Sequence, residues 1–181
     1  MSSTHFSSTA SATSDQGRQY LTFLVGNEEY GMDILKVQEI KGFAPPTSVP
    51  NTPAYIRGVM NLRGTVIPVL DLRVKFNLPD PQYTKFTVIV VANLGERTIG
   101  LVVDAVSDVL EIRDSDVEPP PDLVTDAQTA FITGMVTKTE RLIMLMDVDQ
   151  VINPEALPLD QEILGDDRSE PEETESECAS T

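Results

Sequence analysis

The sequence has few of the residues on which most enzymes and metal sites depend. Its 181 residues include one cysteine, one histidine and no tryptophan. Cys178 has no second cysteine to pair with, which excludes an intrachain disulfide, a CxxC redox motif and a zinc site built on cysteines. The histidine, His5, lies in a polar segment near the start of the chain. Because the core holds neither residue type, we expect no catalytic residues, no metal and no cofactor.

Positive charge is also scarce. The chain carries 13 Lys and Arg against 29 Asp and Glu, a formal net charge of -16. Nucleic acids and anionic lipids attract basic surfaces, so neither is expected to bind. No run approaches the ~18 consecutive apolar residues of a membrane-spanning helix, and the start of the chain lacks the pattern of a secretory signal. The sequence therefore predicts a cytoplasmic protein with no direct membrane insertion.

Two stretches at the ends lack the apolar residues needed for a core. Residues 1–17 are dominated by Ser, Thr and Ala, and the stretch 156–181 holds seven acids against one arginine between Asp166 and Glu177. Such segments cannot bury enough apolar surface to offset the entropy of ordering. We therefore expect two disordered tails, 1–17 and 156–181, around a folded domain at residues 18–155.

Between these tails, apolar and polar residues alternate with the two-residue period of β-strands. The predicted strands are 20–25, 30–34, 37–40, 58–62 and 65–70 in the first half, and 86–92, 97–103, 106–113, 131–136 and 141–146 in the second. Short helical turns are expected at 71–76 and 147–152. The strand order is therefore the same in both halves.

The two halves also resemble each other in sequence. Residues 55–72 align without a gap on residues 131–148, with identities at Ile56/Ile132, Gly58/Gly134, Ile67/Ile143 and Asp71/Asp147. Earlier, residues 31–33 resemble 100–102, and residues 37–40 resemble 109–112 if about three residues are inserted between them. We interpret this as an internal duplication. Five short strands usually close into a small barrel, so the predicted fold is all-β, with two packed five-stranded β-barrel subdomains.

Asp71 and Asp147 are the only core residues that suggest catalysis, as a carboxylate pair for acid–base chemistry. They occupy equivalent positions of the repeat, however, where a strand gives way to a helical turn. A carboxylate at such a place accepts backbone N–H bonds as an N-cap. We favour the capping interpretation, and the protein is predicted not to be an enzyme.

The most distinctive polar feature is the stretch Asn61-Leu62-Arg63-Gly64. These residue types are ordinary in a hairpin turn, but the repeat has Lys138-Thr139-Glu140 at this place, so the turn does not require an arginine. A guanidinium is well suited to fixing a carboxylate, and Glu39 is the candidate partner. From the residues alone, Arg63 either serves only the turn or has a further role.

Four stretches carry a more specific pattern: residues 28–40 (EEYGMDILKVQEI), 51–64 (NTPAYIRGVMNLRG), 69–73 (VLDLR) and 100–110 (GLVVDAVSDVL). Together they resemble the CheW family, the coupling proteins of bacterial chemosensory arrays. The resemblance implies two SH3-like barrels and a non-enzymatic scaffold that couples methyl-accepting chemotaxis receptors to the histidine kinase CheA. The regulatory domain of that kinase is similar to this fold, so adaptor and kinase can alternate in rings. An adaptor of another chemosensory pathway, serving pilus motility or development, is the alternative.

The resemblance also implies which residues bind the partners. By position, the kinase-facing set is Val37, Glu39, Arg57, Gly58 and Arg63, and it includes an internal Glu–Arg pair. The receptor-facing set, in a groove between the barrels, is Ile34, Val88, Val106 and Val109. A groove of β-branched residues suits an amphipathic receptor helix, and the alternative is that these residues are ordinary core. The implied location is at chemoreceptor arrays on the inner face of the membrane.

Overall fold

A computed structural model describes residues 17–79, 82–121 and 129–152 of the chain. The described part contains ten strands: β1 (Arg18–Val25), β2 (Glu28–Asp33), β3 (Val37–Gly42), β4 (Ile56–Leu62), β5 (Thr65–Asp71), β6 (Val88–Leu94), β7 (Arg97–Val103), β8 (Ala105–Ile112), β9 (Ile132–Lys138) and β10 (Arg141–Met146). Its helices are single turns, α1 (Leu72–Lys75) and α2 (Val148–Val151), with 3₁₀ turns η1 (Ile34–Lys36) and η2 (Asp114–Asp116). The predicted all-β class with short helical turns is confirmed. The two predicted tails, apart from Gly17, lie outside the described residues.

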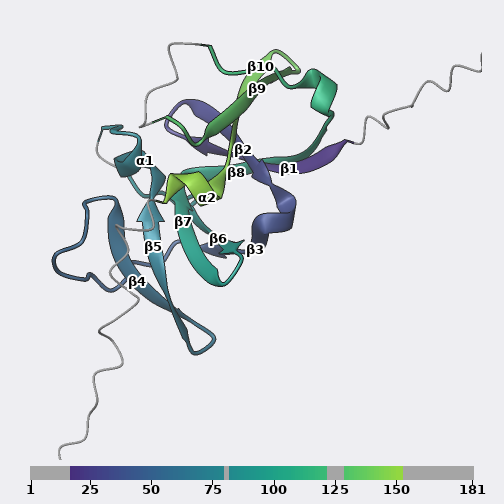
Figure 1. Cartoon of the computed structure of the whole chain (residues 1–181). Helices are drawn as coiled ribbons and strands as arrows, with labels where there is room; N and C mark the ends of the chain where they lie inside the picture. Colours follow the sequence, from purple (N-terminus) through teal and green to yellow (C-terminus); the bar gives the residue numbers. More distant parts are fainter. Residues whose placement is uncertain (1–16, 80–81, 122–128, 153–181) are drawn as a thin grey trace, which may run out of the picture.

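The ten described strands form two five-stranded sheets (Figure 1). Sheet A has the order β8-β1-β2-β10-β9, and sheet B has the order β3-β6-β7-β5-β4. Each sheet combines the opening hairpin of one half of the chain with three strands of the other half. Parallel ladders join the two contributions, β2 to β10 and β7 to β5. The halves are therefore intertwined, and neither can complete its sheet alone.

The pairing registers relate the two sheets residue by residue. In the parallel ladders Gly31 lies opposite Leu145, and Gly100 lies opposite Val69. Because Leu145 and Val69 are equivalent in the gapless part of the repeat, Gly31 and Gly100 are equivalent too. Both sheets also carry bulges at corresponding places. This agreement supports the internal duplication inferred from the sequence.

The same registers correct one detail of the alignment. Val37, Glu39 and Ile40 of β3 take the positions that Val106, Asp108 and Val109 take on β8. The spacing from Gly31 to Ile40 therefore equals the spacing from Gly100 to Val109. The expected insertion of about three residues is wrong. The likeness of residues 37–40 to 109–112 reflects the alternation that all such strands share.

Neither sheet closes into a complete barrel, contrary to the expectation. Sheet A ends in β8 and β9, and sheet B ends in β3 and β4. Each opening is crossed by one isolated bridge, Glu118 to Met135 in sheet A and Thr47 to Val59 in sheet B. Each bridge has two backbone hydrogen bonds of 2.8 Å. Prolines lie next to both bridges, at Pro46 and Pro119, and a proline cannot donate to a ladder.

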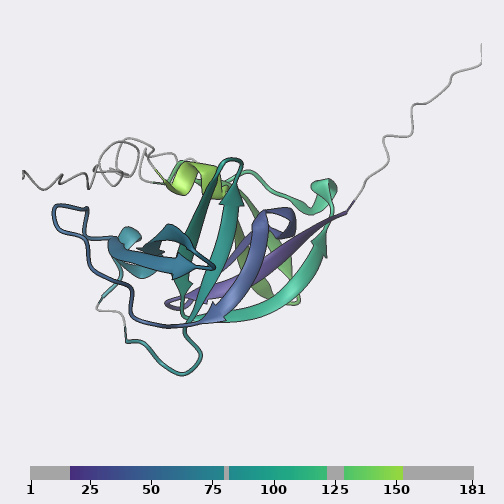
Figure 2. The ribbon, with the colours of Figure 1, turned by 90° about the horizontal axis from the view of Figure 1, so that it is seen from below.

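The hydrophobic core has three parts among the described residues. One cluster lies within sheet B around Ile67, and another lies within sheet A around Ile143. The largest combines both sheets, with Phe23 of sheet A and Leu70 and Leu101 of sheet B. Both sheets are strongly twisted, as the view from below shows (Figure 2). Two small sheets thus gain stability from a core that they share.

Asp71 and Asp147 begin the two helical turns. Asp71 Oδ1 accepts the backbone N–H of Arg73 at 2.9 Å, and Asp147 Oδ1 accepts that of Asp149 at 3.1 Å. Each aspartate is the N-cap of its helix. The capping interpretation is confirmed.

Candidate interaction surfaces

The residues predicted to face the kinase lie at the two open edges of sheet B. Val37 and Glu39 belong to β3, Arg57 and Gly58 belong to β4, and Arg63 lies in the turn from β4 to β5. Since β3 and β4 are the end strands of this sheet, residues far apart in the sequence meet where the sheet is open.

An ion pair between Arg63 and Glu39 spans this opening. Arg63 Nη2 donates to Glu39 Oε2 at 2.6 Å. The Arg63 side chain is 75% exposed and the Glu39 side chain 21%, and Glu39 Oε1 is buried without a hydrogen-bond partner among the described residues. Arg63 and Gly64 both have positive φ, 52° and 89°, as in a two-residue type I′ hairpin. The partner that the sequence suggested for Arg63 is confirmed.

Gly58 has a structural reason to be glycine. Its φ is 142°, and a Cβ at this position would overlap the carbonyl oxygen of Thr47. That carbonyl takes part in the bridge across the opening of sheet B. Gly58 is also buried, so it supports the surface from beneath and offers no side chain to a partner.

The corresponding end of sheet A has the same fold but different chemistry. Asp108 and Thr139 stand where sheet B has Glu39 and Arg63. The guanidinium is therefore missing, and Asp108 Oδ1 accepts the backbone N–H of Val109 instead, at 2.7 Å. The two ends are alike in shape and unlike in charge.

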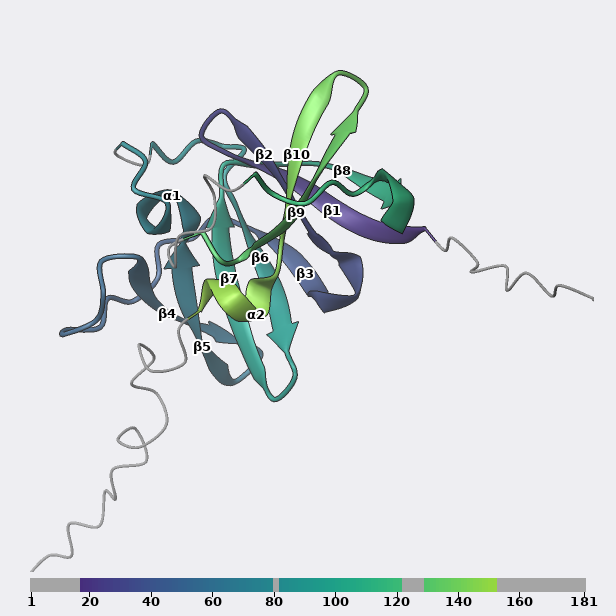
Figure 3. The same cartoon turned by 45° about the horizontal axis from the view of Figure 1, so that its top comes forward.

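Both ends expose a pair of apolar side chains at equivalent positions. Ile40 and Val66 lie on sheet B, Val109 and Leu142 correspond to them on sheet A, and all four are between 44% and 52% exposed. The β4–β5 and β9–β10 hairpins point to opposite ends of the molecule (Figures 1 and 3). The chain therefore presents two related apolar surfaces that face different directions.

The residues predicted to face the receptors divide into two groups. Ile34, Val88 and Val106 are half-buried and pack against the core that the sheets share. Val109 lies farther along β8 and is exposed. The structure thus gathers three of the four at the margin of the shared core, and the fourth lies on an edge strand of sheet A.

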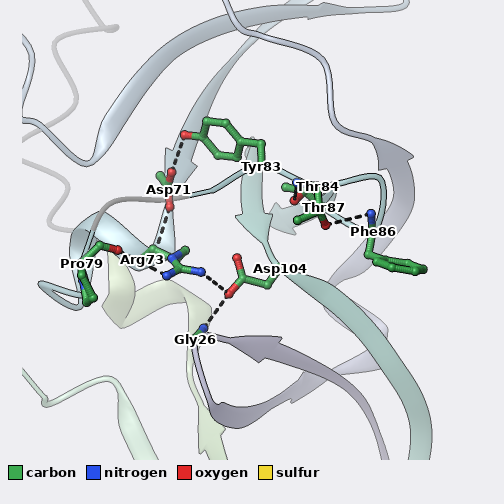
Figure 4. A network of polar contacts seen from close by, with 9 residues as sticks. All are labelled: Gly26, Asp71, Arg73, Pro79, Tyr83, Thr84, Phe86, Thr87 and Asp104. Carbon is green, nitrogen blue, oxygen red and sulfur yellow. Dashed lines mark hydrogen bonds and ion pairs between the residues drawn. The ribbon is translucent and has the colours of Figure 1, made fainter.

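A polar network joins the two sheets beside α1 (Figure 4). Asp104, between β7 and β8, accepts the N–H of Gly26 at 2.6 Å and the Arg73 guanidinium at 2.9 Å, both through Oδ2. Gly26 lies in the β1–β2 turn of sheet A, whereas Arg73 lies on α1, directly after β5 of sheet B. Sequence reasoning missed this network because its partners are 78 and 31 residues apart.

A second ion pair lies at the other junction of the sheets, with the signs of the connector and helix residues reversed. Lys36 of η1 pairs with Asp149 of α2, and Asp149 corresponds in the repeat to Arg73. In each case one ion pair ties a connector between the sheets to a short helix. The two connections between the sheets are therefore built alike.

A hollow of about 400 Å³ lies beside Arg57. Phe43 and Tyr83 line it with ring centroids 4.2 Å apart, and the Arg57 guanidinium lies 5.8 Å from the Tyr83 centroid. The Tyr83 hydroxyl donates to Asp71 Oδ2 at 2.8 Å. Burial, followed by this hydrogen bond, raises the pKa of Tyr83 to about 12. The hollow was not predicted, since no local pattern brings Phe43 and Tyr83 together.

Within residues 17–79, 82–121 and 129–152, no group of three or more His, Cys, Asp or Glu side chains is placed to hold a metal ion. Over the same residues no helix has the length and apolar character to cross a membrane. These residues do offer contact surface, in the form of ion pairs, exposed apolar side chains and an aromatic hollow.

Comparison with known proteins shows the family. The model of the CheW-like domain matches residues 19–156. The chemotaxis protein CheW of Klebsiella aerogenes is 44% identical over 79% of this chain and 86% of its own length, and that of Rhizobium meliloti is 40% identical over 77% and 90%. The crystal structure of the scaffolding protein TtCheW from Thermoanaerobacter tengcongensis has a TM-score of 0.72 at 32% identity, covering 78% of this chain and 98% of that one. The chain therefore belongs to the family of CheW-like domain proteins.

Proposed function

We propose that this protein is a non-enzymatic scaffold of bacterial chemotaxis, which couples methyl-accepting chemotaxis receptors to the histidine kinase CheA at chemoreceptor arrays in the cytoplasm. Family membership supports this role. The observation that carries it is the pair of related but unequal ends, of which only one has the Glu39–Arg63 ion pair. A scaffold that holds different proteins at the same time needs surfaces that differ in chemistry.

We assign the binding surface for the kinase to the open edges of sheet B. A guanidinium has five N–H donors, and among the described residues Arg63 uses only Nη2, toward Glu39. Its exposed donors are free for a carboxylate or carbonyl of the kinase. Val37 and Arg57 complete the surface, Gly58 maintains it from beneath, and Ile40 and Val66 add exposed apolar area.

We assign the binding surface for the receptor to the junction of the two sheets. Ile34, Val88 and Val106 are half-buried there, so each keeps part of its apolar surface for a partner, and Val109 extends this surface along β8. A row of β-branched side chains suits the apolar face of an amphipathic helix. We propose residues 18–155 as the functional unit, because both sheets draw strands from both halves.

Reconstitution tests this function. Kinase autophosphorylation is measured with receptor membranes, with and without the full chain. We expect stimulation that needs the scaffold, the receptor and the kinase together, and no stimulation would reject the proposal. Arg63→Glu should weaken binding to the kinase alone, and Val106→Glu should weaken binding to receptor membranes alone. If either variant lost binding to the kinase and to the receptors equally, the assignment of the two surfaces would be rejected.

A further inference from the structure

Three cations without a carboxylate partner among the described residues lie on the segments that form the hollow beside Arg57, namely Lys41, Arg57 and Lys85. A fourth, Lys75, lies on α1, which contributes no residue to the lining. Lys41 lies two residues before Phe43, and Lys85 lies two residues after Tyr83. Lys75 Nζ lies 4.4 Å from the ring centroid of Tyr55, the residue between Ala54 and Ile56 of the lining. The hollow therefore combines an aromatic wall with one cation in its lining, Arg57, and further cations on neighbouring residues.

The charge of the chain is divided sharply between its parts. Residues 34–104, which supply all of sheet B, contain eight Lys and Arg against five Asp and Glu. Residues 17–33 and 105–152, which supply sheet A, contain four against thirteen. Residues 153–181 contain one against ten. Sheet B is thus the basic part of an acidic chain. Long-range electrostatic attraction therefore favours the binding of an acidic segment to this sheet.

The segment at residues 155–164 has chemistry complementary to the hollow. Its sequence, EALPLDQEIL, places leucines and isoleucine among three acids. Apolar side chains of this kind fit an aromatic wall, while carboxylates pair with surrounding lysine and arginine. Further acids follow from Asp166 onward and add to the attraction.

The position of α2 brings the segment within reach. Ile152, directly after α2, belongs to the shared core, which also includes Val90 of sheet B. Eleven residues lead from Ile152 to Ile163, and an extended chain of that length spans up to ~36 Å. A domain of this size has a radius of gyration of only ~14 Å. We propose that residues 155–164 dock in cis into the hollow beside Arg57.

Docking at this place covers Arg57 of the kinase-facing set. The segment would then compete with the kinase for the edge of sheet B, a consequence that rests on the proposed function. The docking itself does not depend on that function. It can therefore be tested without the kinase or the receptors, and the two proposals can fail separately.

A spin label within the segment tests the docking in the full chain. Because Cys178 is the only cysteine, Cys178→Ser with Gln161→Cys leaves one labelling site. We expect paramagnetic loss of amide peak intensity for residues near Phe43, Arg57 and Tyr83, with peaks of sheet A retained. The loss should disappear in Arg57→Glu/Lys85→Glu and shrink in about 0.5 M NaCl, where the Debye length is only ~4 Å. Lys138→Glu, a reversal on sheet A, is the matched control and should change nothing.

Three outcomes would overturn the proposal. If the amide peaks of residues near the hollow kept their intensity, or if intensity were lost evenly over both sheets, the segment would not dock there. Losses that grow with protein concentration would assign the hollow to the segment of a second copy. Persistence of the losses in Leu159→Ser/Ile163→Ser/Leu164→Ser would show that charge alone attracts the segment, without insertion into the hollow.

Discussion

Arg63 Nη2 lies 2.6 Å from Glu39 Oε2, and this ion pair connects the two ends of an open five-stranded sheet. Together with the bridge between Thr47 and Val59, it holds sheet B in a nearly closed form. The arginine is mostly exposed and the carboxylate mostly covered. The pair therefore shapes the edge of the sheet while leaving its cation accessible.

Arg63→Ala should impair kinase binding more than it lowers stability. The arginine is 75% exposed, and exposed ion pairs contribute only about 0–1 kcal/mol. Thr139→Ala is the matched control, because Thr139 has the same φ of 52° in the equivalent hairpin. Thermal unfolding and kinase binding are measured for both variants. We expect similar small decreases in Tm and a binding loss for Arg63→Ala alone; a matching loss in Thr139→Ala would assign the effect to the turn.

Gly58→Ala should destabilise the domain strongly. Its φ of 142° disfavours a side chain, and a Cβ would displace Thr47 from the bridge. A strained backbone position costs about 1–3 kcal/mol, and the lost bridge adds to that. Gly42→Ala is the control, because a Cβ there meets nothing within 4 Å. Urea unfolding of both variants measures the difference, and equal midpoints would contradict this role of Gly58.

Asp104→Asn should weaken the connection between the sheets. Asp104 Oδ2 accepts from Gly26 and from Arg73, and both side chains of the ion pair are about one-fifth exposed, at 19% and 22%. Disrupting a covered, charge-assisted hydrogen bond costs about 1–3 kcal/mol. Lys36→Met breaks the more exposed ion pair with Asp149 at the other junction of the sheets and should cost less. Urea unfolding measures the loss of stability in both variants. A larger loss for Lys36→Met would show that burial does not decide which ion pair contributes more.

Alkaline pH should destabilise the fold through its tyrosines. Folding raises the pKa of Tyr83 to about 12, above the ~10 of a free phenol. The folded state binds this proton more tightly, so the contribution to stability is complete below about pH 10 and is lost as the pH approaches 12. Burial raises the pKa of Tyr30 to about 12 as well. We expect urea midpoints to fall across this window and to fall less steeply in Tyr83→Phe. If the urea midpoint of Tyr83→Phe fell as steeply with pH as that of the unchanged protein, Tyr83 would not be the group responsible.

The strands and caps could be predicted because their causes are local. Alternating side chains mark the strands, and the aspartates before each helical turn mark the caps. The equivalence of Gly58 and Gly134 was also visible in the sequence, and the structure gives its reason at Gly58, where a Cβ would meet Thr47. The insertion placed before Val109 was wrong because a short run of alternating residues aligns equally well in several registers.

By itself, the sequence determined the strand content, the repeat and the candidate pair of Glu39 with Arg63. Tertiary structure alone decided that each opening hairpin joins the sheet of the other half, that each sheet stays open except for one bridge, and that Phe43 meets Tyr83 beside Arg57. Local patterns specify which residues form strands and turns. The choice of partner depends on non-local packing, since the same apolar face can be buried against either half until the shared core forms.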